Sequence, residues 1–209
     1  LPQIGDALVE RARSIVATHF LRETDADVLL TIDSDISFNP DDAMTICKQA
    51  EELQAIVVGA YNTRSFDKKK PTSELWPGQQ VTFANDSTPV SVKYGASGFM
   101  AIHRSVLDKL AETLPLLHAE QPWHFYPFYH TEVVDDLQAG PILLSEDFAF
   151  CAKAREHGIE TYLNPAVRLG HLGEHIYTIE DMAWAPPVKN AAVRLTKAEE
   201  GTIYQVEVA

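Results

Sequence analysis

Basic residues are scarce in this sequence, and their scarcity limits the partners that the protein can bind. The 209 residues include 17 Lys and Arg against 30 Asp and Glu, which gives a formal net charge of −13. A chain without a basic excess lacks the electrostatic footprint of a nucleic-acid-binding protein, so we expect neither nucleic acid nor an anionic membrane as its main partner. An anionic substrate would need local neutralisation by a divalent cation or by a few well-placed Lys and Arg side chains.

Cysteines and long apolar runs are also scarce. The two cysteines, Cys47 and Cys151, fall within helical patterns and are typical of small core residues, which favours a reducing compartment and a cytoplasmic location. No signal peptide and no apolar run of about 18 residues is present, so we expect no transmembrane segment. The remaining composition, 45% hydrophobic and 22% charged, is typical of a globular chain that buries a substantial core.

The most informative stretch of the chain is Val28–Phe38, VLLTIDSDISF, in which an apolar run leads into Asp33-Ser34-Asp35. A continuous apolar run predicts a strand buried on both faces, as in a parallel α/β sheet, and ligands bind beyond the carboxyl ends of such strands. Residues two apart on an extended chain point the same way, so Asp33 and Asp35 can face one point. Two carboxylates there suit Mg²⁺ or Mn²⁺ bound together with substrate phosphates, although a solvated loop would have the same sequence.

The order of elements around this strand predicts the fold. A helix with apolar residues every four positions covers roughly residues 7–22, and it carries Arg13, which either reaches substrate phosphates or forms a surface ion pair. After the strand, Asn39-Pro40 begins the next helix, and the apolar run 55–61 is a second buried strand. Strand, helix and strand in this order form the unit of a parallel sheet, so we expect an α/β fold with a mainly parallel sheet between helices.

Later segments supply further polar groups at predicted strand ends. Gly95-Ala96-Ser97-Gly98 precedes a strand at 99–103, and its glycines either form a tight turn or let the backbone approach a ligand. Glu146 and Asp147 open a helix after an apolar run, where they either favour the helix dipole or provide a general base. His171 follows a strand and a glycine and is a candidate imidazole ligand for an ion held by the D-x-D segment.

Four segments in this order resemble glycosyltransferases of the GT-A type. They read LLTIDSDISFNPDD, YGASGFMAIHRSVLDKL, SEDFAFCAKAREHGIETYLNP and LGHLGEH, and the resemblance covers roughly residues 7–175. It implies a GT-A, Rossmann-like fold, a nucleotide-sugar donor such as a UDP- or GDP-sugar, an acceptor that is a saccharide, lipid or protein, and a divalent metal at the D-x-D motif, usually Mn²⁺ and alternatively Mg²⁺. The predicted site residues are Asp33, Ser34, Asp35, Ser97, Gly98 and Arg13 for donor binding, Asp33, Asp35 and His171 for the metal, and Asp147 and Glu146 for catalysis.

The boundaries and the chemistry leave alternatives open. We expect one GT-A-like domain over residues 1–175 and a C-terminal extension over 176–209 that packs on it. Members of the family normally begin with a strand and a loop that hold the nucleotide base, so this chain, which begins almost at the first predicted helix, either lacks that piece or is naturally short. Two other functions could use the same residues: a metal-dependent phosphohydrolase acting through Asp33 and Asp35, and a catalytically silent module that binds a nucleotide-sugar.

Overall fold

The computed structural model describes residues 7–64, 70–118, 124–136, 140–173, 175–179, 181, 192–198 and 204–208. Its α-helices are α1 (Val9–Glu23), α2 (Pro40–Leu53), α3 (Arg104–Ala111) and α4 (Glu146–Glu156), and no helix among the described residues is long and apolar enough to cross a membrane. The strands of the main sheet are β1 (Val28–Ile32), β3 (Ile56–Ala60), β5 (Val90–Val92), β6 (Phe99–His103) and β11 (Thr161–Arg168). The smaller sheets contain β2 (Ile36–Ser37), β4 (Gln80–Phe83), β7 (Leu117–His118), β8 (His124–Phe125), β9 (Glu132–Asp136), β10 (Gly140–Leu144), β12 (Gly170–Leu172), β13 (Ile176–Tyr177), β14 (Val193–Lys197) and β15 (Tyr204–Val208).

The main sheet is mixed, and the prediction of a mainly parallel sheet between helices is therefore wrong. Its strand order is β1-β6-β3-β11-β5, in which β3 and β11 are the parallel neighbours. β6 is antiparallel to both β1 and β3, and β5 is antiparallel to β11. β1 and β3 do run in the same direction, as a strand–helix–strand unit requires, but β6 lies between them. The long connection from β3 to β6 makes this insertion possible, and the apolar pattern of the strands does not reveal it.

β1 lies at the edge of the main sheet, contrary to the prediction of a strand buried on both faces. Most of its residues are half-buried and Ile32 is 39% exposed, whereas all five residues of β3 are buried. An edge strand that packs against a helix still needs apolar side chains, and β1 packs against α2. For this reason an apolar run does not distinguish an edge strand from a central one.

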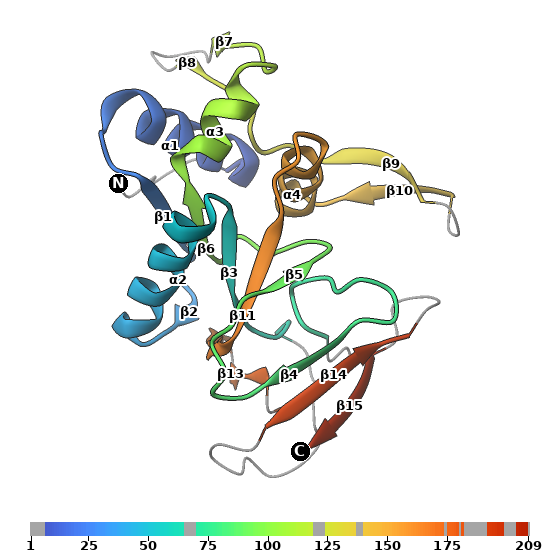
Figure 1. Cartoon of the computed structure of the whole chain (residues 1–209). Coiled ribbons are helices and arrows are strands. Elements are labelled where there is room, and N and C mark those ends of the chain that lie inside the picture. Colours follow the sequence, from blue (N-terminus) through green and yellow to red (C-terminus); the bar gives the residue numbers. More distant parts are fainter. Residues whose placement is uncertain are drawn as a thin grey trace.

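Helices lie on both faces of the main sheet (Figure 1). Side chains alternate between the faces of a strand, and the core is divided accordingly. Val58 and Met100 belong to one cluster, together with residues of α1, α3 and α4, while Val57 and Ala101 belong to the other, together with residues of α2. The sheet is thus held rigidly from both sides, which fixes the positions of the loops at its edges.

The small sheet β4-β14-β15 joins the C-terminal segment to the rest of the chain. β14 pairs with β4, and Val193 and Leu195 of β14 lie in the same core cluster as Val58 of β3. A domain boundary near residue 175 stays a prediction, because residues 182–191 and 199–203 lie outside the described part of the chain.

Polar groups gather at one edge of the main sheet. Because β1, β3 and β11 run in the same direction, their carboxyl ends lie on the same edge as the amino end of β6. Asp33 follows β1, Tyr61 follows β3 and Gly98 precedes β6. β12 comes soon after β11 and pairs with β2, which brings His171 next to the segment that follows β1. The D-x-D segment, the glycine loop and His171 are therefore neighbours in space.

Candidate functional site

Asp33 and Asp35 lie in a turn between β1 and β2 rather than on an extended strand. The Ile36 N–H donates to the Asp33 carbonyl oxygen at 3.1 Å, and the Asp33 N–H donates to the Gly98 carbonyl oxygen at 2.9 Å. On an extended strand, side chains two residues apart point the same way, and this was the basis for predicting that the two carboxylates face one point. The turn breaks this alternation. Each carboxylate instead has its own cationic partner, and Ser34 between them is exposed.

The imidazole of His171 faces the carboxylate of Asp35. Its Nε2 is 3.4 Å from Asp35 Oδ2, and its Nδ1 is 2.9 Å from the backbone carbonyl oxygen of Asn62. A carbonyl oxygen only accepts hydrogen bonds, so Nδ1 is the donor, and in the neutral ring Nε2 keeps its lone pair. The ring of Tyr61 packs edge-on against the imidazole, with the centroids 5.3 Å apart. His171 Nε2 and the carboxylate oxygen of Asp35 are thus held toward one another.

These two groups fit a divalent cation that is shared with a substrate. A carboxylate oxygen and an imidazole nitrogen are suitable ligands for Mn²⁺, and the carbonyl bound to Nδ1 is the usual kind of partner that orients a metal-binding histidine. Among the described residues, no group of three or more His, Cys, Asp or Glu side chains is placed to hold a metal ion. Two protein ligands suit an ion whose other positions are taken by phosphate oxygens and water. The metal itself stays a prediction.

Arg13 connects the D-x-D turn to the start of α4. Its Nη2 donates to both carboxylate oxygens of Asp33, at 3.0 and 3.1 Å, and its Nη1 donates to the Ser97 carbonyl oxygen at 3.4 Å. Its Nε is 3.7 Å from Glu146 Oε1. Burial lowers the pKa of Arg13, but the charge of Asp33 and the hydrogen bond to it outweigh burial, so the pKa lies above its usual value. The arginine side chain of this ion pair is only 14% exposed, whereas that of Asp33 is 41% exposed, so the pair lies at the surface end of a buried arginine.

Glu146 and Asp147 lie in the first turn of α4, beside the glycine loop. Asp147 Oδ2 accepts a hydrogen bond from the Ser97 N–H at 3.4 Å, and its Oδ1 accepts one from the Ser145 hydroxyl. Ser145 therefore binds Asp147 and makes no side-chain cap to the helix. Burial, and then the charge of Asp147, raise the pKa of Glu146 above its ordinary value. The two acids thus differ, since Asp147 holds the loop while Glu146 binds a proton more readily than an ordinary glutamate.

Gly98 is packed so closely against its neighbours that a side chain would collide with them. A Cβ at this position would lie 2.3 Å from the Tyr61 hydroxyl oxygen and 3.3 Å from Asp33 Oδ2. The same hydroxyl oxygen accepts a hydrogen bond from the Gly98 N–H at 3.0 Å. Burial, and then the charge of Asp33, raise the pKa of Tyr61, so its hydroxyl stays protonated at neutral pH. The glycine is required here by close approach to Tyr61.

Three contributors to this site were not singled out from the sequence: Tyr61, Asn62 and Arg64. Tyr61 contacts both Gly98 and His171, the backbone of Asn62 orients His171, and Arg64 pairs with the D-x-D turn. Their only signal in the sequence was position, because they directly follow a buried strand whose carboxyl end was expected at the ligand-binding edge.

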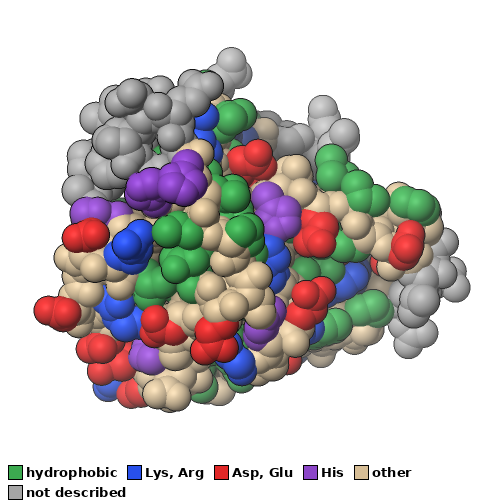
Figure 2. Space-filling model, turned by 90° about the horizontal axis from the view of Figure 1, so that it is seen from above, with side chains coloured by type: hydrophobic (Ala, Val, Ile, Leu, Met, Phe, Trp, Pro, Cys, Tyr) green, Lys and Arg blue, Asp and Glu red, His purple; other side chains and the backbone are tan. Residues whose placement is uncertain are grey.

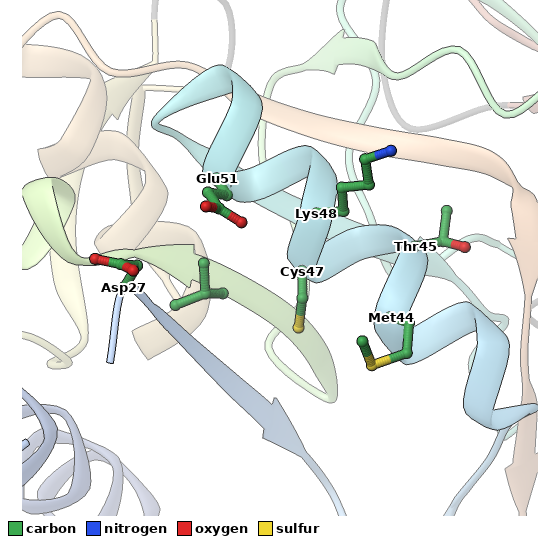
Figure 3. A pocket seen from close by; sticks show the side chains of 7 residues that line it. Asp27, Met44, Thr45, Cys47, Lys48 and Glu51 are labelled. Atoms are coloured by element: carbon green, nitrogen blue, oxygen red, sulfur yellow. The ribbon is translucent and has the colours of Figure 1, made fainter. Parts of the chain in front are cut away.

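A hollow of about 660 Å³ lies at the other end of β1, between this strand and α2 (Figure 3). It is lined by Asp27, Val28, Met44, Thr45, Cys47, Lys48 and Glu51. Asp27 precedes Asp33 by six residues, which corresponds to about 20 Å along a strand. The hollow is therefore separate from the polar edge, and it contains none of the predicted site residues.

The surface charge can be followed on one face of the molecule. On the face drawn in Figure 2, Lys and Arg side chains lie singly among acidic ones and do not gather into a patch.

Comparisons with known proteins give only weak similarities. No protein-family model matches the chain, and no curated protein matches its sequence. The crystal structure of A197 from STIV is similar with a TM-score of 0.47 and 16% identity, over 97% of this chain and 77% of that chain. The crystal structure of GalNAc-T7 with UDP, GalNAc and Mn²⁺ is similar with a TM-score of 0.47 and 15% identity, over 79% of this chain and 30% of that chain. This chain therefore spans less than a third of GalNAc-T7, and neither similarity is strong enough to assign a family.

Proposed function

We propose that the protein is a glycosyltransferase that takes a sugar from a nucleotide-diphosphate sugar and holds the diphosphate through a divalent cation, Mn²⁺ or Mg²⁺. The observation that carries the proposal is the pair formed by Asp35 and His171, whose facing oxygen and nitrogen are 3.4 Å apart at the carboxyl edge of the sheet. The order of the four sequence motifs supports the same function. An acidic chain with a net charge of −13 also needs a local positive charge to bind a diphosphate.

The cation would be held by Asp35 and His171, and when bound it would neutralise the diphosphate and the charge that develops on the leaving group. In the neutral ring, the Asn62 carbonyl oxygen favours the tautomer that has its proton on Nδ1 and its lone pair on Nε2, which faces the carboxylate. Tyr61 packs edge-on against this imidazole, so contacts within the protein orient the ring.

The donor sugar would lie beside the glycine loop. Gly98 is buried, and the Tyr61 hydroxyl lies where its Cβ would be, so the glycine allows the loop to pack close to Asp33. Arg13 holds Asp33 and the Ser97 carbonyl oxygen, and it thereby fixes the distance between the D-x-D turn and this loop. We assign to Asp147, whose Oδ2 lies at the Ser97 N–H, the role of base or acceptor-orienting group.

The proposal is tested with a panel of UDP- and GDP-sugars in the presence of Mn²⁺, with and without saccharide acceptors. Release of the nucleoside diphosphate reports turnover, and thermal shift reports binding. We expect turnover that requires the metal, and a loss of Mn²⁺ affinity of at least about tenfold in Asp35→Asn and His171→Ala. Asp27→Asn is the matched control, because it removes the same charge from the hollow at the other end of β1.

Three results would contradict the proposal. Phosphate release from simple phosphate esters, without any transfer of sugar, would indicate the phosphohydrolase. Binding of nucleotide-sugars without turnover, with every acceptor tried, would indicate the silent module. Full Mn²⁺-dependent activity in His171→Ala would show that His171 does not bind the metal ion.

A further inference from the structure

Arg64 binds the same carboxylate oxygen that faces His171. Its Nη1 is 3.0 Å from Asp35 Oδ2, while His171 Nε2 is 3.4 Å from that oxygen. The three side chains differ in exposure, at 52% for Arg64, 31% for Asp35 and 15% for His171. The carboxylate and imidazole are therefore the fixed part of this group, and the guanidinium is its outer and more movable part.

A divalent cation at this position and the guanidinium of Arg64 would repel each other. A metal ion bonded to Asp35 Oδ2 would lie about 2 Å from that oxygen, so its charge would be within about 5 Å of Nη1 where the arginine now stands. This repulsion favours the departure of one cation, and the half-exposed arginine is the one that can move.

We propose that Arg64 is a built-in counter-cation of Asp35, which a divalent metal ion displaces and which then binds the phosphates of the donor. The inference rests on the proposed function and adds a residue and a sequence of events to it. Before loading, Arg64 neutralises a carboxylate in an acidic chain. After displacement, its guanidinium is free beside the ion, and its planar array of donors suits phosphate oxygens.

The proposal predicts two changes of opposite sign when Arg64 is replaced. Removal of a competitor strengthens Mn²⁺ binding to the protein without nucleotide. Loss of an exposed ion pair of this kind should lower the dissociation constant of Mn²⁺ by about 1.5- to 5-fold. Removal of a phosphate-binding group weakens the binding of a nucleoside diphosphate to the Mn²⁺-loaded protein, by at least about threefold. A residue with a merely structural role would weaken both.

The experiment compares the wild type, Arg64→Gln and Arg64→Lys in two titrations. Free Mn²⁺ is measured by electron paramagnetic resonance in the protein alone, and UDP and GDP are titrated by calorimetry at saturating Mn²⁺. Arg64→Lys keeps the positive charge and should remain close to the wild type in the first titration. The matched control is Arg22→Gln, which removes the same charge from an exposed position nine residues beyond Arg13 on α1, about 13 Å along the helix axis.

The expected result is tighter Mn²⁺ binding and weaker nucleotide binding in Arg64→Gln, with neither change in Arg22→Gln. Unchanged Mn²⁺ affinity in Arg64→Gln, or weakening of both ligands, overturns the role of Arg64 while the proposed function stands. Absence of Mn²⁺ binding from the wild type and every variant, with and without nucleotide, overturns both. Circular dichroism of each variant confirms that the fold is retained in the titrated samples.

Discussion

Replacement of Gly98 by alanine tests the packing on which the candidate site depends. The added Cβ would lie 2.3 Å from the hydroxyl oxygen and 2.9 Å from Cζ of Tyr61, and 3.3 Å from Asp33 Oδ2. Tyr61 is itself buried, at 5% exposure, so its ring cannot swing away into solvent. The glycine loop or the tyrosine has to shift, and the hydrogen bond from the Gly98 N–H is strained or lost with it.

Overpacking of this kind costs about 1–3 kcal/mol in the free energy of unfolding. For a chain of this length, each kcal/mol lowers the Tm by about 2–4 °C, so we expect a fall of roughly 2–12 °C in Gly98→Ala. Urea denaturation and differential scanning calorimetry measure both quantities. Gly173→Ala is the control, because the atoms that its Cβ would meet, Arg64 Cδ and Tyr177 Cε2, both lie at 3.3 Å, which is 1.0 Å farther than the Tyr61 hydroxyl oxygen lies at Gly98.

The double variant Gly98→Ala, Tyr61→Phe identifies the cause. Tyr61→Phe alone leaves the Gly98 N–H without its acceptor, but in the double variant it also removes the atom closest to the new Cβ. The cost of the double variant should therefore be smaller than the sum of the single costs by at least about 0.5 kcal/mol. Strict additivity, or a Gly98→Ala protein as stable as the wild type, would refute the reasoning.

Three further predictions concern the first turn of α4 and the thiols. Asp147→Asn should lower turnover by about 10²–10⁴-fold with a stability change under about 1 kcal/mol, and a near-normal rate in initial-velocity assays would exclude it as the base. Because the pKa of Glu146 is raised in the folded state, the wild type loses stability as pH rises from its unfolded pKa through this folded pKa. The unfolding free energy of Glu146→Gln relative to the wild type should therefore increase from pH 4 to pH 7, as measured by urea unfolding. The same difference between the two proteins at both pH values would contradict this. Burial raises the pKa of the Cys151 thiol to about 11 and raises that of half-buried Cys47, so Ellman's reagent should leave Cys151 unmodified until the protein unfolds.

Local signals in the sequence were sufficient where the structure is decided locally. Asn39 was predicted to cap a helix with proline at its first position, and its side chain accepts a hydrogen bond from the Asp41 N–H at 3.1 Å. The strands expected near 28–32, 55–61 and 99–103 are β1, β3 and β6. Their pairing was predicted wrongly, because an apolar run records burial of side chains and not the direction or identity of the neighbouring strand.

Some residues of the site could also be predicted from local signals in the sequence. Asp33, Asp35 and His171 could be named because they are possible metal ligands that follow predicted strands, where ligands bind, and the structure brings them to one edge. Their contacts could not be named, since Arg13 binds Asp33 across 20 positions and Asn62 orients His171 across 109. Arg64 had no distinguishing pattern at all. The role of a lone arginine after a strand can be inferred only when the structure shows which carboxylate lies beside it.

The insertion of β6 between β1 and β3 makes the site depend on residues that are far apart in the sequence. Four contacts of the site join residues 37, 50, 84 and 109 positions apart, so none of these four belongs to a local hairpin or helix. Contacts of such long range close large loops, and chains rich in them fold in milliseconds to seconds rather than microseconds. β1 carries the D-x-D turn and has β6 as its one strand neighbour in the described sheet, so the turn reaches the rest of that sheet only through β6. A nascent chain that ended before residue 98 would therefore contain both aspartates without the surface that positions them.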